Sequence, residues 1–163
     1  MPASNANLRR DADAAERVLT ITRVFDAPRE LVFKLWTDPA HAKHWMGPRG
    51  FTATHFEQES RPGGSWRLCL REDDSGRELW QGGVVREIAA PARLVYTFAW
   101  DREDGSRGHE TLVTITFAEQ DGKTRMTLHQ AEFESVPQRD GHRGGWNSAF
   151  DRFAEYAAAL ARA

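Results

Sequence analysis

The stretch Gly144-Gly145-Trp146-Asn147-Ser148-Ala149-Phe150-Asp151-Arg152-Phe153, near the end of the chain, decides the fold. From within it, apolar residues recur at alternating spacings of four and three: Trp146, Phe150, Phe153, Ala157 and Leu160. This spacing places them on one face of an α-helix, with charged side chains on the other face. We predict a helix from about Gly141 onward, roughly 30 Å long and therefore able to cross a β-sheet.

Most of the chain before this helix consists of segments in which apolar and polar residues alternate. A period of two is typical of half-buried strands, and short polar turns separate the segments. The predicted strands span residues 18–25, 52–59, 66–71, 78–88, 93–100, 109–118 and 123–132. Strands joined by short turns indicate one antiparallel meander, which the terminal helix would cover.

Two short helices are predicted between the first two strands. The first follows Asp26-Ala27-Pro28, because proline suits the first position of a helix. The second follows Asp38-Pro39, where the Asp38 side chain can cap the helix. It ends near Gly47-Pro48. The sequence therefore predicts an α+β fold.

Composition excludes several classes of protein. The chain has 163 residues, 40% of them hydrophobic, which fits one domain, and we expect residues 1–17 to form a disordered tail before a domain at 18–163. A net charge of −2 argues against nucleic-acid binding, and the single cysteine excludes an intrachain disulfide. Apolar runs are too short to span a membrane, and no secretory signal is visible. We expect a cytoplasmic monomer or homodimer.

Several stretches, in this order, resemble a known family: Ile21-Thr22-Arg23-Val24-Phe25-Asp26-Ala27-Pro28, Trp36-Thr37-Asp38-Pro39, His44-Trp45-Met46-Gly47-Pro48, Arg61-Pro62-Gly63-Gly64 and Gly144-Gly145-Trp146. They resemble the START-like, or SRPBCC, superfamily, and within it the AHSA1-like branch named for the activator of Hsp90 ATPase. The resemblance implies a helix-grip fold, in which a curved antiparallel sheet of six to seven strands surrounds a long C-terminal helix.

Polar candidates for chemistry each have a simpler explanation. Asp38, His41 and His44 lie three residues apart and could approach a metal ion, but a capped surface helix explains the same residues. Cys69 alternates with apolar neighbours and points away from them, which favours an unreactive thiol. We therefore predict no metal site and no cofactor.

An acid/base pair is conceivable at His55 and Glu57, which share one face of a predicted strand. An exposed polar face explains them equally well, and the status of His129 is similarly open. No nucleophile elbow, phosphate loop or dinucleotide fingerprint is present. We therefore assign no catalytic residue.

The strongest functional signal is the aromatic content of the chain. We predict that a set of large rings from separate elements lines an apolar ligand site: Trp36, Trp45, Trp66, Trp80, Tyr96, Phe98, Trp146, Phe150 and Phe153. A filled core is the alternative for each of them. Gly82 and Gly83 lie inside a predicted strand and would allow a bend or a close approach there.

Three functions compete on this basis. The first is a module that binds a hydrophobic or amphipathic small molecule between the sheet and the C-terminal helix. The second, implied by the family resemblance, is a partner that stimulates a chaperone ATPase. The third, implied by START-like relatives, is a polyketide cyclase or dehydratase with an acid/base residue in the pocket. A deep cavity favours the first or third, whereas an exposed apolar patch favours the second.

Overall fold

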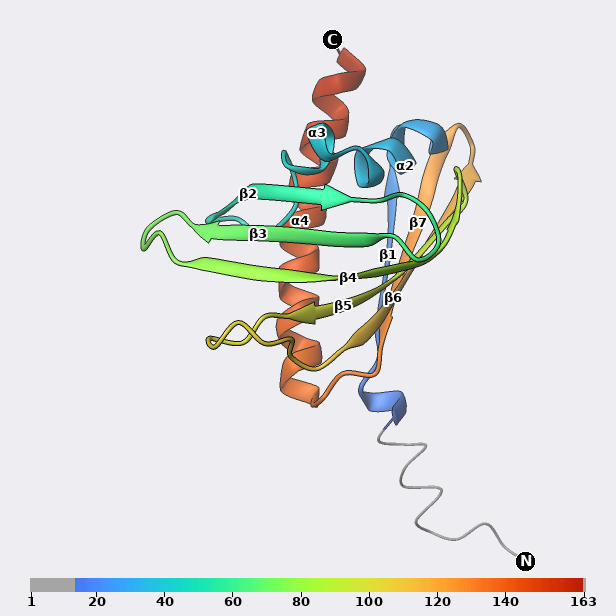
Figure 1. The fold of residues 1–163 in the computed structure, drawn as a ribbon. Coiled ribbons are helices and arrows are strands. Elements are labelled where there is room, and N and C mark those ends of the chain that lie inside the picture. The colour runs from blue at the N-terminus through green and yellow to red at the C-terminus, as the bar shows by residue number, and fades with distance from the viewer. Residues whose placement is uncertain (1–13, 163) are drawn as a thin grey trace, which may run out of the picture.

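A computed structural model describes residues 14–162 and shows one curled antiparallel sheet that wraps around a long helix (Figure 1). The seven strands are β1 (Leu19–Phe25), β2 (Phe51–Gln58), β3 (Ser65–Glu72), β4 (Glu78–Ala89), β5 (Arg93–Trp100), β6 (Thr111–Gln120) and β7 (Lys123–Ala131). The helices are α2 (Arg29–Thr37), α3 (Pro39–Ala42) and α4 (Val136–Arg162). This confirms the predicted helix-grip architecture.

The sheet has the order β1-β7-β6-β5-β4-β3-β2, so every sequential pair from β2 to β7 forms a hairpin. The first strand pairs with the last, and α2 and α3 connect β1 to the opposite edge. The pairing register shifts between Ala53 and His55 and again between Val85 and Glu87. Such irregularities increase the local twist of a strand, which helps the sheet to curl around α4.

The two short helices lie where the sequence predicts them. The Asp38 carboxylate accepts a hydrogen bond of 2.9 Å from the backbone N–H of Ala40, and Pro39 occupies the first turn of α3. This confirms the predicted cap. Pro28 lies one position outside α2, as its N-cap.

The long helix begins at Val136, earlier than the predicted start near Gly141. Ser135 caps it, because its side-chain Oγ accepts a hydrogen bond of 3.2 Å from the N–H of Gln138. Three glycines at 141, 144 and 145 lower the helix propensity of this half, so apolar periodicity first becomes visible after them.

Residues 14–17, which we expected to belong to the tail, form a short turn of helix against the domain. The backbone N–H of Phe133 donates to the carbonyl of Arg17 at 3.3 Å, and the Arg139 guanidinium donates to the carbonyl of Glu16. The remainder of the predicted tail, residues 1–13, lies outside the described residues.

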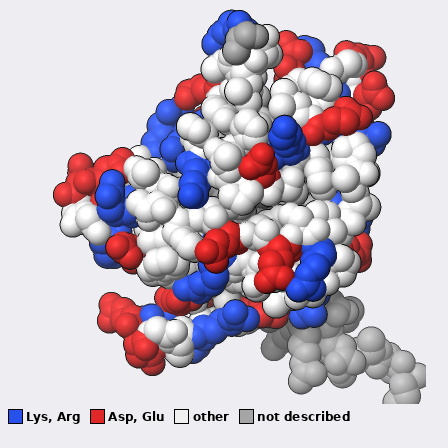
Figure 2. Space-filling view, turned by 45° about the horizontal axis from the view of Figure 1, so that its top comes forward, with Lys and Arg blue, Asp and Glu red and all other residues white. Residues whose placement is uncertain are grey.

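Charge on the surface is mixed. On the face in Figure 2, basic and acidic side chains are interspersed, in keeping with a net charge of −2. Within residues 14–162, neither α4 nor a shorter helix has the length and hydrophobicity of a membrane-spanning segment.

Candidate functional site

A cavity of about 440 Å³ lies between the β2–β5 part of the sheet and the first half of α4. Its lining consists mainly of apolar side chains and small residues: Met46, Gly47, Pro48, Phe51, Leu68, Leu70, Leu79, Gln81, Phe98, Trp100, Pro137, Gln138, Gly141, His142, Gly145, Trp146 and Ala149. Pro137, Gln138 and Gly141 are exposed, so the cavity opens beside the first turns of α4. Its volume falls in the range typical of small-molecule sites.

Small residues on α4 keep this space open. Gly141, Gly145 and Ala149 are four residues apart and therefore lie on one face of the helix, toward the cavity. A Cβ atom added at Gly141 or Gly145 would meet no atom within 4 Å beyond its chain neighbours and the adjacent backbone of α4. The absence of side chains at these two positions leaves room between the helix and the sheet.

No Lys, Arg, Asp or Glu belongs to the described lining. Its polar side chains are Gln138 at the mouth, His142 on α4 and Gln81 on β4. A charged ligand would leave water without meeting an opposite charge, which is strongly unfavourable. The lining therefore suits a neutral molecule.

The imidazole of His142 is held in its neutral form. Its Nε2 accepts a hydrogen bond of 3.0 Å from the indole N–H of Trp100, and the rings of Phe98 and Phe133 pack 5.2 and 5.0 Å away, centroid to centroid. Burial lowers the pKa of His142 from 6.5 to about 4. Because the Trp100 indole can only donate, Nε2 carries no proton and Nδ1 carries the hydrogen.

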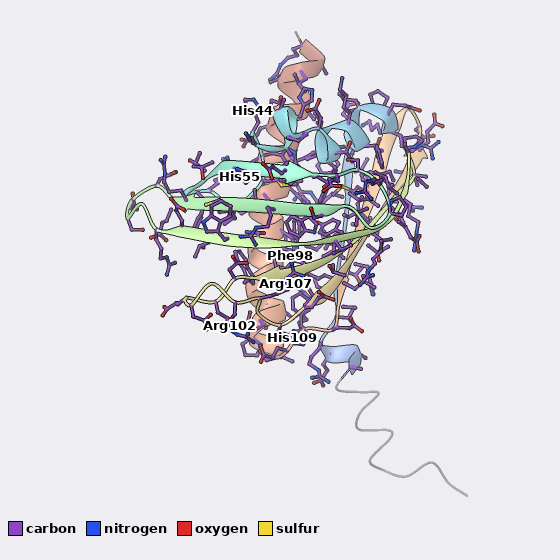
Figure 3. All side chains as sticks on the ribbon, viewed as in Figure 1. His44, His55, Phe98, Arg102, Arg107 and His109 are labelled. Atoms are coloured by element: carbon purple, nitrogen blue, oxygen red, sulfur yellow. The ribbon has the colours of Figure 1, made fainter. Side chains whose placement is uncertain are left out.

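The Trp100–His142 pair also lines a second hollow of about 240 Å³ beside the cavity. This hollow is more polar, and it is lined in part by Arg102 and His109 from the loop between β5 and β6 (Figure 3). The two hollows share Phe98, Trp100, Gln138 and His142 in their linings.

Gln81 lies deep in the apolar cavity, between Leu68 of β3 and Trp100 of β5 in the pairing register. Its residue surface is only 4% exposed, and its Nε2 has no hydrogen-bond partner among the described residues. It also lines a small void of about 20 Å³ that adjoins the cavity on its inner side. A buried amide donor without a partner is rare and calls for an explanation.

Trp146 is fixed on the inner side of the cavity. Its indole N–H donates to Gln130 Oε1 at 2.8 Å, and Gln130 Nε2 donates to the hydroxyl of Thr111 at 2.9 Å. The Trp146 ring stacks on Phe150, with centroids 5.5 Å apart. The indole therefore joins the cavity to the packed core.

The structure divides the nine predicted site aromatics into four groups. Phe98, shown in Figure 3, and Trp146 line the main cavity. Trp36, Trp66 and Tyr96 line the adjoining small void, where burial raises the pKa of Tyr96. The two cavity-lining groups therefore contain five of the nine predicted residues.

The remaining predicted aromatics lie away from both spaces. Trp45, Phe150 and Phe153 are fully buried in the core. Trp80 lies on the outer face of the sheet, where the Arg67 guanidinium stacks over its ring at 5.1 Å. The placement of Trp80 in the pocket is therefore corrected: in the Leu79-Trp80-Gln81 stretch, the two neighbours point inward.

The outer face also carries an ion pair. The Arg67 guanidinium donates two hydrogen bonds of 2.8 Å to the Asp101 carboxylate, and these lower the pKa of Asp101. His55 (Figure 3) packs 5.4 Å from Trp80, and its Nε2 lies 3.6 Å from Glu57 Oε1. The predicted acid/base pair is thus close together but does not face the cavity.

The other polar candidates have structural partners. His41 Nδ1 lies 2.7 Å from the Tyr156 hydroxyl, and the His44 ring stacks on Tyr156 at 4.7 Å. His129 Nδ1 lies 3.3 Å from the hydroxyl of Thr20 on the neighbouring strand. Within residues 14–162, no group of three or more His, Cys, Asp and Glu could hold a metal ion.

Cys69 is buried, and its Sγ lies 3.7 Å from Glu78 Oε2. The predicted close approach at the strand glycines is confirmed. Gly83 pairs with Trp66, whose indole N–H reaches across to the Thr97 carbonyl at 2.8 Å. A Cβ at Gly83 would lie 1.9 Å from that carbonyl oxygen. These glycines therefore permit tight packing and do not line the cavity.

Sequence reasoning missed the three polar side chains of the cavity lining, Gln81, Gln138 and His142, and the small residues that open the cavity. A signal for Gln81 was present, because it occupies an inward position in a strand whose neighbours at that face are apolar. The spacing of Gly141, Gly145 and Ala149 could have indicated the open helix face, because residues four apart lie on the same side of a helix.

Comparisons with known proteins agree with this fold. A crystal structure of an AHSA1 protein from Silicibacter pomeroyi is similar, with a TM-score of 0.80 and 25% identity over 88% of this chain and 99% of that chain. A solution NMR structure of a protein from Arthrobacter aurescens has a TM-score of 0.79 and 25% identity over 90% of this chain and 88% of that one. A search of curated proteins found no match.

A family model described as "Activator of Hsp90 ATPase homolog 1-like protein" matches residues 26–158. This range includes most of the described domain, from the end of β1 to the last turns of α4. The chain therefore belongs to the activator of Hsp90 ATPase homolog 1-like protein family.

Proposed function

We propose that this protein binds a neutral, hydrophobic small molecule between its sheet and the first half of α4. The observation that carries the proposal is the cavity of about 440 Å³ whose described lining contains no Lys, Arg, Asp or Glu. Apolar burial contributes roughly 25 cal/mol per Å², so about 300 Å² of ligand surface supplies about 7.5 kcal/mol before the costs of association.

Two alternatives receive less support. A chaperone partner, which the family description suggests, would need an exposed apolar surface, yet Val24 is the one large hydrophobic residue exposed among residues 14–162. A cyclase or dehydratase would need an acid/base pair in the pocket, and His142 is the one titratable side chain in the described lining.

The test uses N-phenyl-1-naphthylamine, a neutral probe whose fluorescence rises in apolar surroundings. We expect saturable binding with weak dependence on salt and a negative change in heat capacity. Trp146→Ala should weaken binding, whereas Asp38→Ala and His41→Ala should leave it unchanged, because those two residues lie outside the cavity lining. Affinity that collapses in salt, or that depends on Asp38 or His41, would contradict the proposal.

A further inference from the structure

The one buried side-chain polar atom without a partner in residues 14–162 lies in the candidate site. It is Nε2 of Gln81, on a residue that is 4% exposed. Buried amide donors are normally satisfied, because leaving one without an acceptor loses the hydrogen bonds that water gave it. Gln81 lines both the cavity and the inner void, so a molecule that fills these spaces lies against this residue.

The surroundings of Gln81 define what can bind there. Four apolar side chains line both spaces together with it: Met46, Leu68, Phe98 and Trp146. A ligand atom that meets Gln81 Nε2 must accept a hydrogen bond, while the atoms around it must be apolar. A ligand oxygen that reaches Gln81 Nε2 would supply the hydrogen bond that this donor lacks.

Resting on the proposed function, we propose that the ligand is a neutral, mostly apolar molecule with a carbonyl oxygen, which accepts a hydrogen bond from Gln81 Nε2. A carbonyl fits because it accepts without bringing a donor of its own, which a hydroxyl would. A carboxylate fits poorly, because no cationic Lys or Arg lines the cavity and the buried His142 stays neutral at pH 7.

The experiment compares two ligands that differ at one group. Benzophenone and diphenylmethane have the same two rings, joined by a carbonyl in the first and by a methylene in the second. Each is titrated against bound N-phenyl-1-naphthylamine in the wild type. We expect benzophenone to bind roughly 3- to 10-fold more tightly, the range that one neutral hydrogen bond supports.

Variants assign this preference to one side chain. Gln81→Leu and Gln81→Met remove the donor at similar volume, and we expect both to bind the two ligands equally. Gln138→Leu is the matched control, because Gln138 lines the mouth of the same cavity, and it should keep the preference. Thermal unfolding checks the fold, and we expect the Gln81 variants to be at least as stable as the wild type, since they remove an unsatisfied group.

The outcomes separate this inference from the proposed function. If the wild type binds both ligands equally, or if the preference survives in both Gln81 variants, the role of Gln81 is overturned while the cavity remains a binding site. If neither ligand nor the probe binds, the proposed function fails and the inference fails with it. The anion 4-benzoylbenzoate should bind more weakly than benzophenone, and tighter binding would overturn the assignment of a neutral ligand.

Discussion

The two halves of α4 differ in how they pack against the sheet. Beyond Trp146, Phe150 and Phe153 pack against the rings of Trp45 and Phe25, with centroids 4.6 to 6.4 Å apart. Before Trp146, Gly141 and Gly145 face the sheet across a cavity. One apolar helix face therefore closes a core in its second half and leaves a space in its first half. The difference is made by side-chain volume, which is large at Phe150 and Phe153 and absent at Gly141 and Gly145.

The second half of α4, which carries Phe150 and Phe153, should contribute most to the free energy of unfolding. Phe150 is fully buried among four other aromatic rings, so Phe150→Ala should destabilise the protein by about 3–5 kcal/mol. Leu79→Ala is the comparison, because Leu79 is half-buried and lines the cavity. We expect a loss less than half as large, measured by urea unfolding. Equal losses would remove the distinction between the packed core and the cavity.

The stability of the protein should depend on pH through His142, which lies in the first half of α4. Its pKa is about 4 in the folded protein and ordinarily 6.5, so the unfolded chain takes up the proton first as pH falls. The neutral His142 therefore contributes fully to the free energy of unfolding above pH 6.5. This contribution, as much as about 3 kcal/mol, is lost as the pH falls from 6.5 to 4.

Urea unfolding across this pH range measures the effect, and His142→Gln is the control, because glutamine cannot take up a proton there. The wild type should lose more stability than the variant between pH 6.5 and 4. Identical pH profiles would show that the imidazole is not held neutral by burial.

Filling the cavity from the first half of α4 should weaken probe binding without lowering the stability of the protein. In Gly145→Leu the new side chain enters the cavity, and we expect probe affinity to fall at least about tenfold, or about 1.4 kcal/mol. Stability should not fall, because leucine is a better helix former than glycine. Gly144→Leu has the same helical gain but lies outside the cavity lining, so its affinity should stay unchanged.

The smallest effect is expected on the outer face of the sheet. Trp80→Ala removes a ring that stacks with Arg67 and does not line the cavity. Probe affinity should change by less than about twofold, since no apolar surface of the site is lost. A tenfold loss would mean that the ligand binds on the outer face.

Strands and helices could be predicted from the sequence, whereas the boundary between core and cavity could not. Alternation located all seven strands within about two residues of their ends, with β5 matching at both ends. It could not say which face of β5 points inward, because Val95 and Ala99 are buried on the other face too.

The sequence also could not show whether an aromatic residue fills the core or lines the cavity. A ring that fills a core and a ring that lines a pocket both need an apolar position, so Phe98 and Phe153 look alike in the sequence. Trp80 was misplaced because a tryptophan can also lie over a guanidinium on a polar face. Small residues at 141, 145 and 149 carried the information on where space remains.

The most direct test follows the six tryptophan indole N–H signals in ¹H–¹⁵N NMR spectra while benzophenone is added. The indoles of Trp100 and Trp146 line the cavity and should shift, whereas those of Trp45 in the core and Trp80 on the outer face should not. This result would place the ligand between the sheet and the first half of α4. Shifts confined to Trp80, or no shifts at saturating ligand, would contradict the account.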